Sequence, residues 1–175
     1  YGVGGVGLSI LAGARLAGAD PLICVDRWEE KLDLARSFGA TAAFNADGRV
    51  HEKILAATAH RGADYVFEAT GSTEVQEAAF NSVRPGGKLI LVGLSATGTE
   101  TNFPGSVITR QEKTILGSYY GSCDPQRDFP LYAAMYLRGE LDLDRLVSKT
   151  YRLEEINTAY SDMLEGQAAR GLITF

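Results

Sequence analysis

The stretch Gly2-Val3-Gly4-Gly5-Val6-Gly7 matches the pattern G-x-G-x-x-G, and the interpretation of the whole chain starts from it. In a strand–turn–helix unit the first glycine makes the tight turn, and the second lets the backbone approach a pyrophosphate. The third packs the helix against the strand. The helix start offers free N–H groups and its positive dipole end to phosphate oxygens. Glycine turns open many helices, so the pattern needs support from the residues that follow.

A helix and a strand follow the glycine turn at the spacing of a βαβ unit. Positions 5–17 carry apolar residues at helical spacing and end at Gly18. Residues 21–26 are almost continuously apolar, as a parallel strand covered on both faces should be. Asp26 ends this strand about 20 residues after the turn, where an acidic side chain hydrogen-bonds the ribose hydroxyls. Together these features predict dinucleotide binding.

Asp26 also predicts which dinucleotide is bound. A carboxylate accepts a hydrogen bond from the 2′-hydroxyl and repels a 2′-phosphate, so it favours NAD over NADP. Arg27 beside it argues the other way, since an arginine there tolerates a phosphate, but a solvated surface arginine is the simpler interpretation. Lys31, one helical turn further on, is within reach of the adenosine ribose, although its position also suits a solvated helix residue.

The rest of the chain repeats the alternation of strand and helix. Further helices are expected around residues 28–39, 50–55, 73–83, 125–138 and 153–164, and further strands at 41–45, 64–68, 88–92, 113–118 and 172–175. Pro85-Gly86-Gly87 is expected as the turn before strand 88–92, and residues 95–104 as a loop. The pattern predicts an α/β protein with a Rossmann-type, doubly wound parallel sheet and helices on both faces.

The start of the sequence is unusual for this fold. It has no Met and runs straight into the glycine turn, whereas the fold needs a buried strand before that turn. We therefore expect the first strand to be truncated and residues to be missing upstream.

Composition and charge exclude several classes of protein. Apolar residues make up 45% of the chain and charged residues 22%, as in an ordinary globular domain. A net charge of −5 and a pI near 5.1 argue against nucleic acid as a partner. No apolar run approaches the roughly 20 residues that span a membrane. Cys24 and Cys123 are not closely spaced, which favours a reducing compartment, so we expect a soluble cytoplasmic protein.

Few residues suit chemistry other than cofactor binding. His51 and His60 lie nine positions apart, and neither cysteine is near them in sequence, so no set of zinc ligands is expected. The nucleophile pattern G-x-S-x-G does not occur, and no pair of acids stands out as an acid/base couple. We expect neither a catalytic residue nor a metal ligand in this chain.

Two segments follow predicted strands at the carboxyl edge, where sheets of this kind bind ligands. They are Glu68-Ala69-Thr70-Gly71 and Val92-Gly93-Leu94. Their backbone groups suit a nicotinamide carboxamide, but the pattern alone is equally that of ordinary strand ends with turns.

These residues, taken in order, resemble the zinc-containing medium-chain alcohol dehydrogenases. The resemblance covers essentially the whole chain, and the segments that carry it are Gly2 to Ser9, Ala17 to Ala19, Val25-Asp26, Phe38 to Thr41, Asp64 to Glu68, Gly86-Gly87, Val92-Gly93, Leu116 to Gly121, Ile156 to Ala159 and Arg170 to Phe175. It implies oxidation of a small-molecule alcohol to an aldehyde or ketone, with NAD+ as the hydride acceptor.

The resemblance also implies roles for individual residues. The glycine turn, through Gly2, Gly4, Gly5, Val6 and Gly7, would hold the pyrophosphate, mainly through the N–H groups of Gly4 to Val6. The remaining roles are the adenosine ribose for Asp26 and Lys31, the nicotinamide for Thr70, Val92, Ser118 and Tyr120, the pyrophosphate for Arg170, and the alcohol pocket for Leu94 and Tyr119.

The family's zinc ligands are supplied by an N-terminal domain, and this sequence contains none of that domain. The resemblance therefore implies a NAD-binding domain over residues 1–119 and a C-terminal segment over residues 120–175 that returns to a catalytic domain outside the chain. The chain alone is expected to be inactive. In relatives the region around residues 101–118 often builds a dimer contact, so a homodimer or homotetramer is expected for the parent protein.

Three other interpretations stay open at this point. A zinc-free NAD(P)H quinone or enone reductase on the same scaffold is usually NADPH-dependent, and Asp26 counts against it. A non-catalytic dinucleotide-binding module would keep the fold without the chemistry. A methyltransferase also combines a glycine turn with an acid, but the segment Gly117 to Gly121 and the ending at Arg170 do not fit it.

Overall fold

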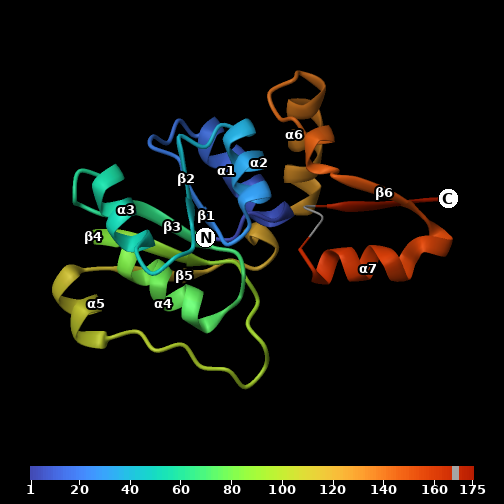
Figure 1. The fold of residues 1–175 in the computed structure, drawn as a ribbon. Helices are drawn as coiled ribbons and strands as arrows, with labels where there is room; N and C mark the ends of the chain where they lie inside the picture. Colours follow the sequence, from blue (N-terminus) through green and yellow to red (C-terminus); the bar gives the residue numbers. More distant parts are fainter. Residues whose placement is uncertain (167–169) are drawn as a thin grey trace.

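The computed structural model describes residues 1–166 and 170–175. Helices and strands alternate along most of the chain (Figure 1). In chain order they are α1 (Gly5–Leu16), β1 (Ile23–Asp26), α2 (Glu29–Ser37), β2 (Ala42–Asn45), α3 (Val50–Ala57), β3 (Ala63–Glu68), α4 (Thr73–Ser82), β4 (Val83–Leu91), α5 (Gly105–Gln111), β5 (Thr114–Gly117), η1 (Tyr120–Ser122), α6 (Pro125–Leu137), η2 (Asp144–Leu146), β6 (Lys149–Arg152), η3 (Leu153–Glu155), α7 (Ile156–Leu164) and β7 (Gly171–Thr174).

Residues Tyr1 and Gly2 join two parallel sheets into one. The first sheet pairs β1 with β2, and the second has the order β3-β4-β5. Gly2 donates its N–H to the Val25 carbonyl at 2.9 Å, and Ala69 donates to the Tyr1 carbonyl at 2.9 Å. The spatial order is therefore β2, β1, residues 1–2, β3, β4, β5, which is the Rossmann order 3-2-1-4-5-6 with a shortened first strand. The predicted fold class is confirmed.

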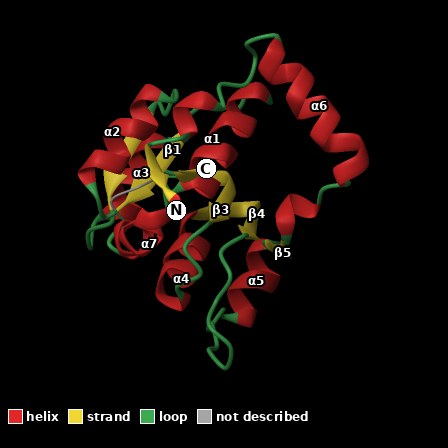
Figure 2. Cartoon of the chain, turned by 90° about the vertical axis from the view of Figure 1, so that its right-hand side faces the viewer, coloured by secondary structure: helices red, strands yellow, loops and turns green. Residues whose placement is uncertain are grey.

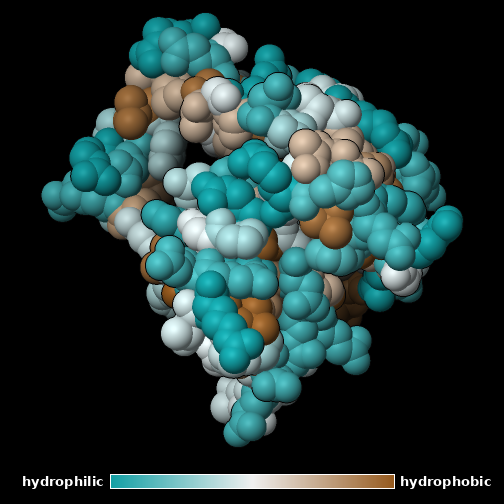
Figure 3. All heavy atoms as spheres, turned by 90° about the vertical axis from the view of Figure 1, so that its left-hand side faces the viewer, coloured by the Kyte–Doolittle hydropathy of each residue, from teal (hydrophilic) through white to brown (hydrophobic). Residues whose placement is uncertain are grey.

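Helices cover both faces of this combined sheet. Figure 1 shows α1 and α2 on one side and α3, α4 and α5 on the other. One apolar core lies between α1, α2 and β1 and includes Leu8, Leu11 and Ala35. A second core lies between α4, β3 and β4 and includes Val66, Phe80 and Leu89. The face that carries α3 and α5 is mainly hydrophilic on the outside (Figure 3).

The expected turn at Pro85-Gly86-Gly87 is wrong, because these residues lie inside β4. Val83 pairs with Ala63, yet Lys88 pairs with Tyr65, so the ladder is irregular between these two pairs. Proline lacks an N–H for the ladder, and Gly86 takes a φ of +71°, which favours glycine. The three residues that predicted a turn instead distort a single strand.

One α-helix and one strand are absent from the sequence prediction, besides short 3-10 turns. Helix α5 follows Pro104 and has only seven residues, none of them buried. Strand β6 has the sequence Lys-Thr-Tyr-Arg, and only Tyr151 in it is buried. Both elements lack the apolar periodicity on which the prediction depends.

The C-terminal part of the chain forms a small unit that packs back onto the first core. Strands β6 and β7 pair in parallel as a separate sheet, and α7 contacts both. The hydroxyl of Tyr151 donates to the Asp162 carboxylate at 2.7 Å, and the nearby Lys149 ammonium lowers the pKa of that carboxyl. Leu146 joins the core of α1 and α2. Helix α6 projects away from the sheets (Figures 1 and 2).

Phe80 tests the second core. Its side chain is 1% exposed and packs against Phe103 with ring centroids 5.3 Å apart. Phe80→Ala should lower the free energy of unfolding by about 3–5 kcal/mol, because it removes buried apolar surface and leaves a cavity. Urea unfolding followed by circular dichroism measures this change.

Phe129 provides the matched control for the same substitution. It is 61% exposed on α6, so Phe129→Ala should change the free energy of unfolding by no more than about 0.5 kcal/mol. Equal effects of the two substitutions would contradict the assignment of Phe80 to a packed core.

Candidate functional site

The glycine turn and the start of α1 are in direct backbone contact. Gly2 has a φ of +86°, and an added Cβ there would lie 2.7 Å from the Thr70 side chain. An added Cβ at Gly7 would lie 1.9 Å from the carbonyl oxygen of Gly2. Neither position accepts a side chain, so the helix start is pressed against the turn.

The start of α1 presents hydrogen-bond donors to open space. Gly4 is the N-cap residue, and an added Cβ there would meet nothing within 4 Å. The first N–H of this helix to find an acceptor is that of Leu8, which donates to Gly4 at 2.9 Å. In the part of the chain that the structure describes, no acceptor faces the N–H groups of Gly5, Val6 and Gly7. Together with the helix dipole, these donors suit phosphate oxygens.

Asp26 is held at the end of β1 by two backbone donors. Its carboxylate accepts from the N–H of Val3 at 2.7 Å and from that of Trp28 at 3.0 Å. A carboxylate has about four acceptor positions, so these two bonds leave capacity for a ligand hydroxyl. Asp26 therefore fixes the glycine turn and keeps a negative charge beside it. The bond to Val3 could not be found from spacing alone.

Lys31 lines a cavity between α2 and the C-terminal unit. The cavity has a volume of about 670 Å³, and its walls include Arg27, Trp28 and Ser148. Arg170 lies near this place, since its backbone exchanges hydrogen bonds with Ser148 at 3.0 and 3.2 Å. The structure thus links both Lys31 and Arg170, which are far apart in sequence, to the surroundings of Ser148.

Glu68, at the same edge of the sheet, is a residue to which the sequence analysis gave no individual role. Its side chain is fully buried, at 0% exposure. One carboxylate oxygen accepts from the N–H of Thr70 at 2.6 Å and from that of Gly71 at 3.1 Å, and also from the Thr70 hydroxyl. The backbone carbonyl of Glu68 accepts from Val92 and Gly93, each at 2.9 Å.

Thr70, Val92 and Ser118 lie together at one edge of the sheet. They follow the carboxyl ends of β3, β4 and β5. Ser118 donates its N–H to the Leu91 carbonyl at 2.9 Å, which continues the pairing of β4 with β5. Since Gly2 also touches Thr70, this edge is continuous with the glycine turn.

The two expected alcohol-pocket residues, Leu94 and Tyr119, and the expected nicotinamide residue Tyr120 are all largely exposed. Leu94 is 84% exposed, Tyr119 71% and Tyr120 80%. The rings of Tyr119 and Tyr120 meet edge to face with centroids 4.5 Å apart. These side chains stand at the surface and form no enclosed pocket with one another.

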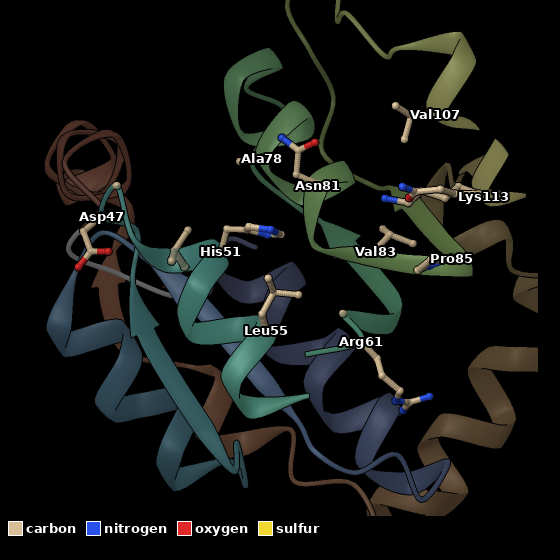
Figure 4. Close-up of a pocket in the computed structure, with 14 residues that line it drawn as sticks. Asp47, His51, Leu55, Arg61, Ala78, Asn81, Val83, Pro85, Val107 and Lys113 are labelled. Carbon is tan, nitrogen blue, oxygen red and sulfur yellow. The ribbon is translucent and has the colours of Figure 1, made fainter. Parts of the chain in front are cut away.

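A cavity of about 570 Å³ lies between α3, α4 and β4, on the face of the sheet opposite to α1 and α2 (Figure 4). His51 and Asn81 point into it, whereas Arg61 points away. It shares no residue with the glycine turn or the loops after β3 and β4.

Among residues 1–166 and 170–175, no group of three or more His, Cys, Asp or Glu is placed to hold a metal ion. No helix in these same ranges is long and apolar enough to cross a membrane.

The strand order, the glycine turn and the acid after β1 define a Rossmann-type α/β domain. Known proteins agree with this class. The sequence pattern of the family described as "Zinc-binding dehydrogenase" matches residues 5–138, and the chain belongs to this family.

Three similar proteins illustrate the relationship. The NDMA-dependent alcohol dehydrogenase of Amycolatopsis methanolica is 36% identical over 99% of this chain and 47% of its own length. The crystal structure of benzyl alcohol dehydrogenase from Acinetobacter calcoaceticus has a TM-score of 0.93 and 33% identity, over 98% of this chain and 47% of that one. An alcohol dehydrogenase zinc-binding domain protein from Burkholderia ambifaria has a TM-score of 0.94 and 33% identity, over 100% and 47%. The chain thus spans about half the length of the relatives it matches.

Gly7 and Gly13 allow a matched test of the helix start. Gly7→Ala should destabilise the fold by at least about 1 kcal/mol, because its Cβ would collide with the Gly2 carbonyl. Gly13 lies in the same helix with nothing within 4 Å of an added Cβ, so Gly13→Ala should stabilise by about 0.5–1 kcal/mol. Thermal unfolding compares the two variants. The same sign for both would contradict the contact.

Proposed function

We propose that this chain is the NAD-binding part of a zinc-dependent alcohol dehydrogenase. The parent enzyme would oxidise an alcohol to an aldehyde or ketone. The observation that carries the proposal is the open N–H groups at the start of α1, directly beside the Asp26 carboxylate, in a member of the zinc-binding dehydrogenase family.

The residues present fit a dinucleotide. Gly4 leaves room for a pyrophosphate at the helix start, because an added Cβ there meets nothing within 4 Å. Asp26 would accept hydrogen bonds from the adenosine ribose and repel a 2′-phosphate, which selects NAD. Its carboxylate already has a fixed orientation, so little rearrangement accompanies binding. When bound, NAD+ supplies the hydride acceptor.

The other candidate residues keep their predicted roles in this proposal. Lys31 would reach the ribose and Arg170 the pyrophosphate, and their common link to the surroundings of Ser148 supports this. The loops at Thr70, Val92 and Ser118, with Tyr120, would surround the nicotinamide, and Leu94 and Tyr119 would face the alcohol. The nicotinamide would then lie at the sheet edge and the pyrophosphate at the helix start.

Zinc is assigned to the rest of the parent enzyme. The described residues do not provide a metal-binding group, so no step through zinc is derived for this chain. By itself the chain should bind NAD without oxidising alcohol. Asp26 argues against the alternative of an NADPH-dependent quinone or enone reductase.

Asp26 tests the choice of cofactor. Asp26→Gly should weaken NAD+ binding roughly 10- to 100-fold, because a hydrogen bond to a charged group contributes about 1.5–3 kcal/mol. NADP+ binding should improve, since the charge that repels its phosphate is removed. Fluorescence of Trp28, the only tryptophan, follows both titrations, and calorimetry checks them.

Asn substitutions provide the control. Asp26→Asn removes the charge with little change in size, whereas Asp33→Asn removes an exposed charge from the following helix, α2. Only the first should change the ratio of the two dissociation constants. An unchanged ratio in both Asp26 variants would refute its assigned role, and a wild-type protein that binds neither cofactor would refute the proposal itself.

The parent protein is proposed to be a cytoplasmic homodimer or homotetramer. In the described part of the chain, β5 is the last strand of its sheet and its other edge is unpaired, with Leu116 on it 44% exposed. An unpaired strand edge invites pairing with another chain. Light scattering of the parent protein should give two or four times the mass of one parent chain. A monomer would contradict the proposal.

A further inference from the structure

Glu68 is a buried acid without a basic side chain to neutralise it. It is fully buried, and no Lys or Arg of the described residues pairs with it. A buried carboxylate is costly unless donors compensate its charge. The hydrogen bonds that compensate it come from two N–H groups and one hydroxyl of Thr70 and Gly71, and the N-terminal ammonium of Tyr1 adds a favourable charge nearby. The acid therefore dictates the conformation of the loop after β3.

The same residue also determines the position of the loop after β4. Its carbonyl receives the N–H groups of Val92 and Gly93. The two loops then touch, since an added Cβ at Gly93 would lie 2.1 Å from the Gly71 nitrogen. An added Cβ at Gly71 would lie 2.3 Å from the Leu94 carbonyl. Glu68 thus connects both loops through its side chain and its backbone.

This arrangement orients groups that a ligand needs. The N–H groups of Thr70, Val92 and Gly93 all point inward to Glu68. Within the described residues, no hydrogen bond ends on the carbonyl oxygens of Thr70 or Val92. Inward donors and available acceptors at the sheet edge suit the amide of a carboxamide.

We propose that Glu68 is a positioning residue for the nicotinamide half of the cofactor and not for its adenosine half. The inference rests on the proposed function. Within the described residues Glu68 makes no hydrogen bond to Asp26 or to the start of α1, although Thr70, which it holds, meets the glycine turn at Gly2. Its main effect should therefore lie at the end of the dinucleotide over the loops at Thr70 and Val92.

Glu68→Gln is the decisive variant. The substitution preserves the size of the side chain. A neutral amide, however, accepts hydrogen bonds from Thr70 and Gly71 less strongly than a carboxylate does. In the intact protein, NAD+ binding should weaken about tenfold. ADP-ribose, which carries the adenosine and pyrophosphate but no nicotinamide, should bind as it does to the wild type. Calorimetry measures both dissociation constants.

Two further variants make the test specific. Glu77→Gln removes another carboxylate that accepts a backbone N–H, from Asn102 at 2.9 Å, and should change neither constant. Thr70→Val removes the hydroxyl that donates to Glu68 and accepts the N–H of Ser72, so it should weaken NAD+ binding about threefold without affecting ADP-ribose. It keeps the acid in place and so provides the test if Glu68→Gln does not fold.

The outcomes separate the two levels of the proposal. A loss confined to NAD+ in the Glu68 or Thr70 variant supports the positioning role. Equal losses for both ligands, or no loss for either, overturn that role while leaving NAD binding intact. A wild-type protein that binds neither ligand refutes the proposed function, and this inference with it.

Discussion

The backbone contact between Gly7 and the carbonyl of Gly2 sets the geometry of the glycine turn and of the strands beside it. Since a methyl group at Gly7 would lie 1.9 Å from that oxygen, helix α1 approaches the turn more closely than any other residue type would allow. The turn in turn fixes residues 1–2 between β1 and β3, which joins two sheets into one. The strand ends then meet at one edge, and the proposed cofactor site depends on that edge.

Two acids organise this edge in different ways. Asp26 keeps a partly exposed carboxylate beside the glycine turn and remains able to accept a ligand hydroxyl. Glu68 is fully buried, and among the described residues its side chain hydrogen-bonds to the loop that follows it. The first acid is thus available to a ligand and the second holds a loop, although both end a parallel strand.

The sequence predicted the parts of the fold that repeat a simple pattern. The strand that ends at Asp26 and the helix before it follow from continuous apolar runs and helical spacing. Strand β6 could not be predicted because only Tyr151 in it is buried, and its stability comes from β7 and α7, which lie later in the chain. The role of Glu68 was missed because glutamate is rarely fully buried, so a strand-end acid suggests exposure. The available signal was Thr70-Gly71 just after it, because their N–H groups and the threonine hydroxyl can donate hydrogen bonds to a buried carboxylate.

The exposure of Leu94 and Tyr119 has an evolutionary consequence. Side chains that are 84% and 71% exposed contribute little to folding, so they are free to change without loss of the sheet or the turn. The glycines and buried acid beside them have no such freedom, since backbone contacts or buried hydrogen bonds constrain each. If Leu94 and Tyr119 face the alcohol as proposed, a lineage built on this framework can therefore change its substrate by drift at a few surface positions without disturbing the glycine turn or the buried acid.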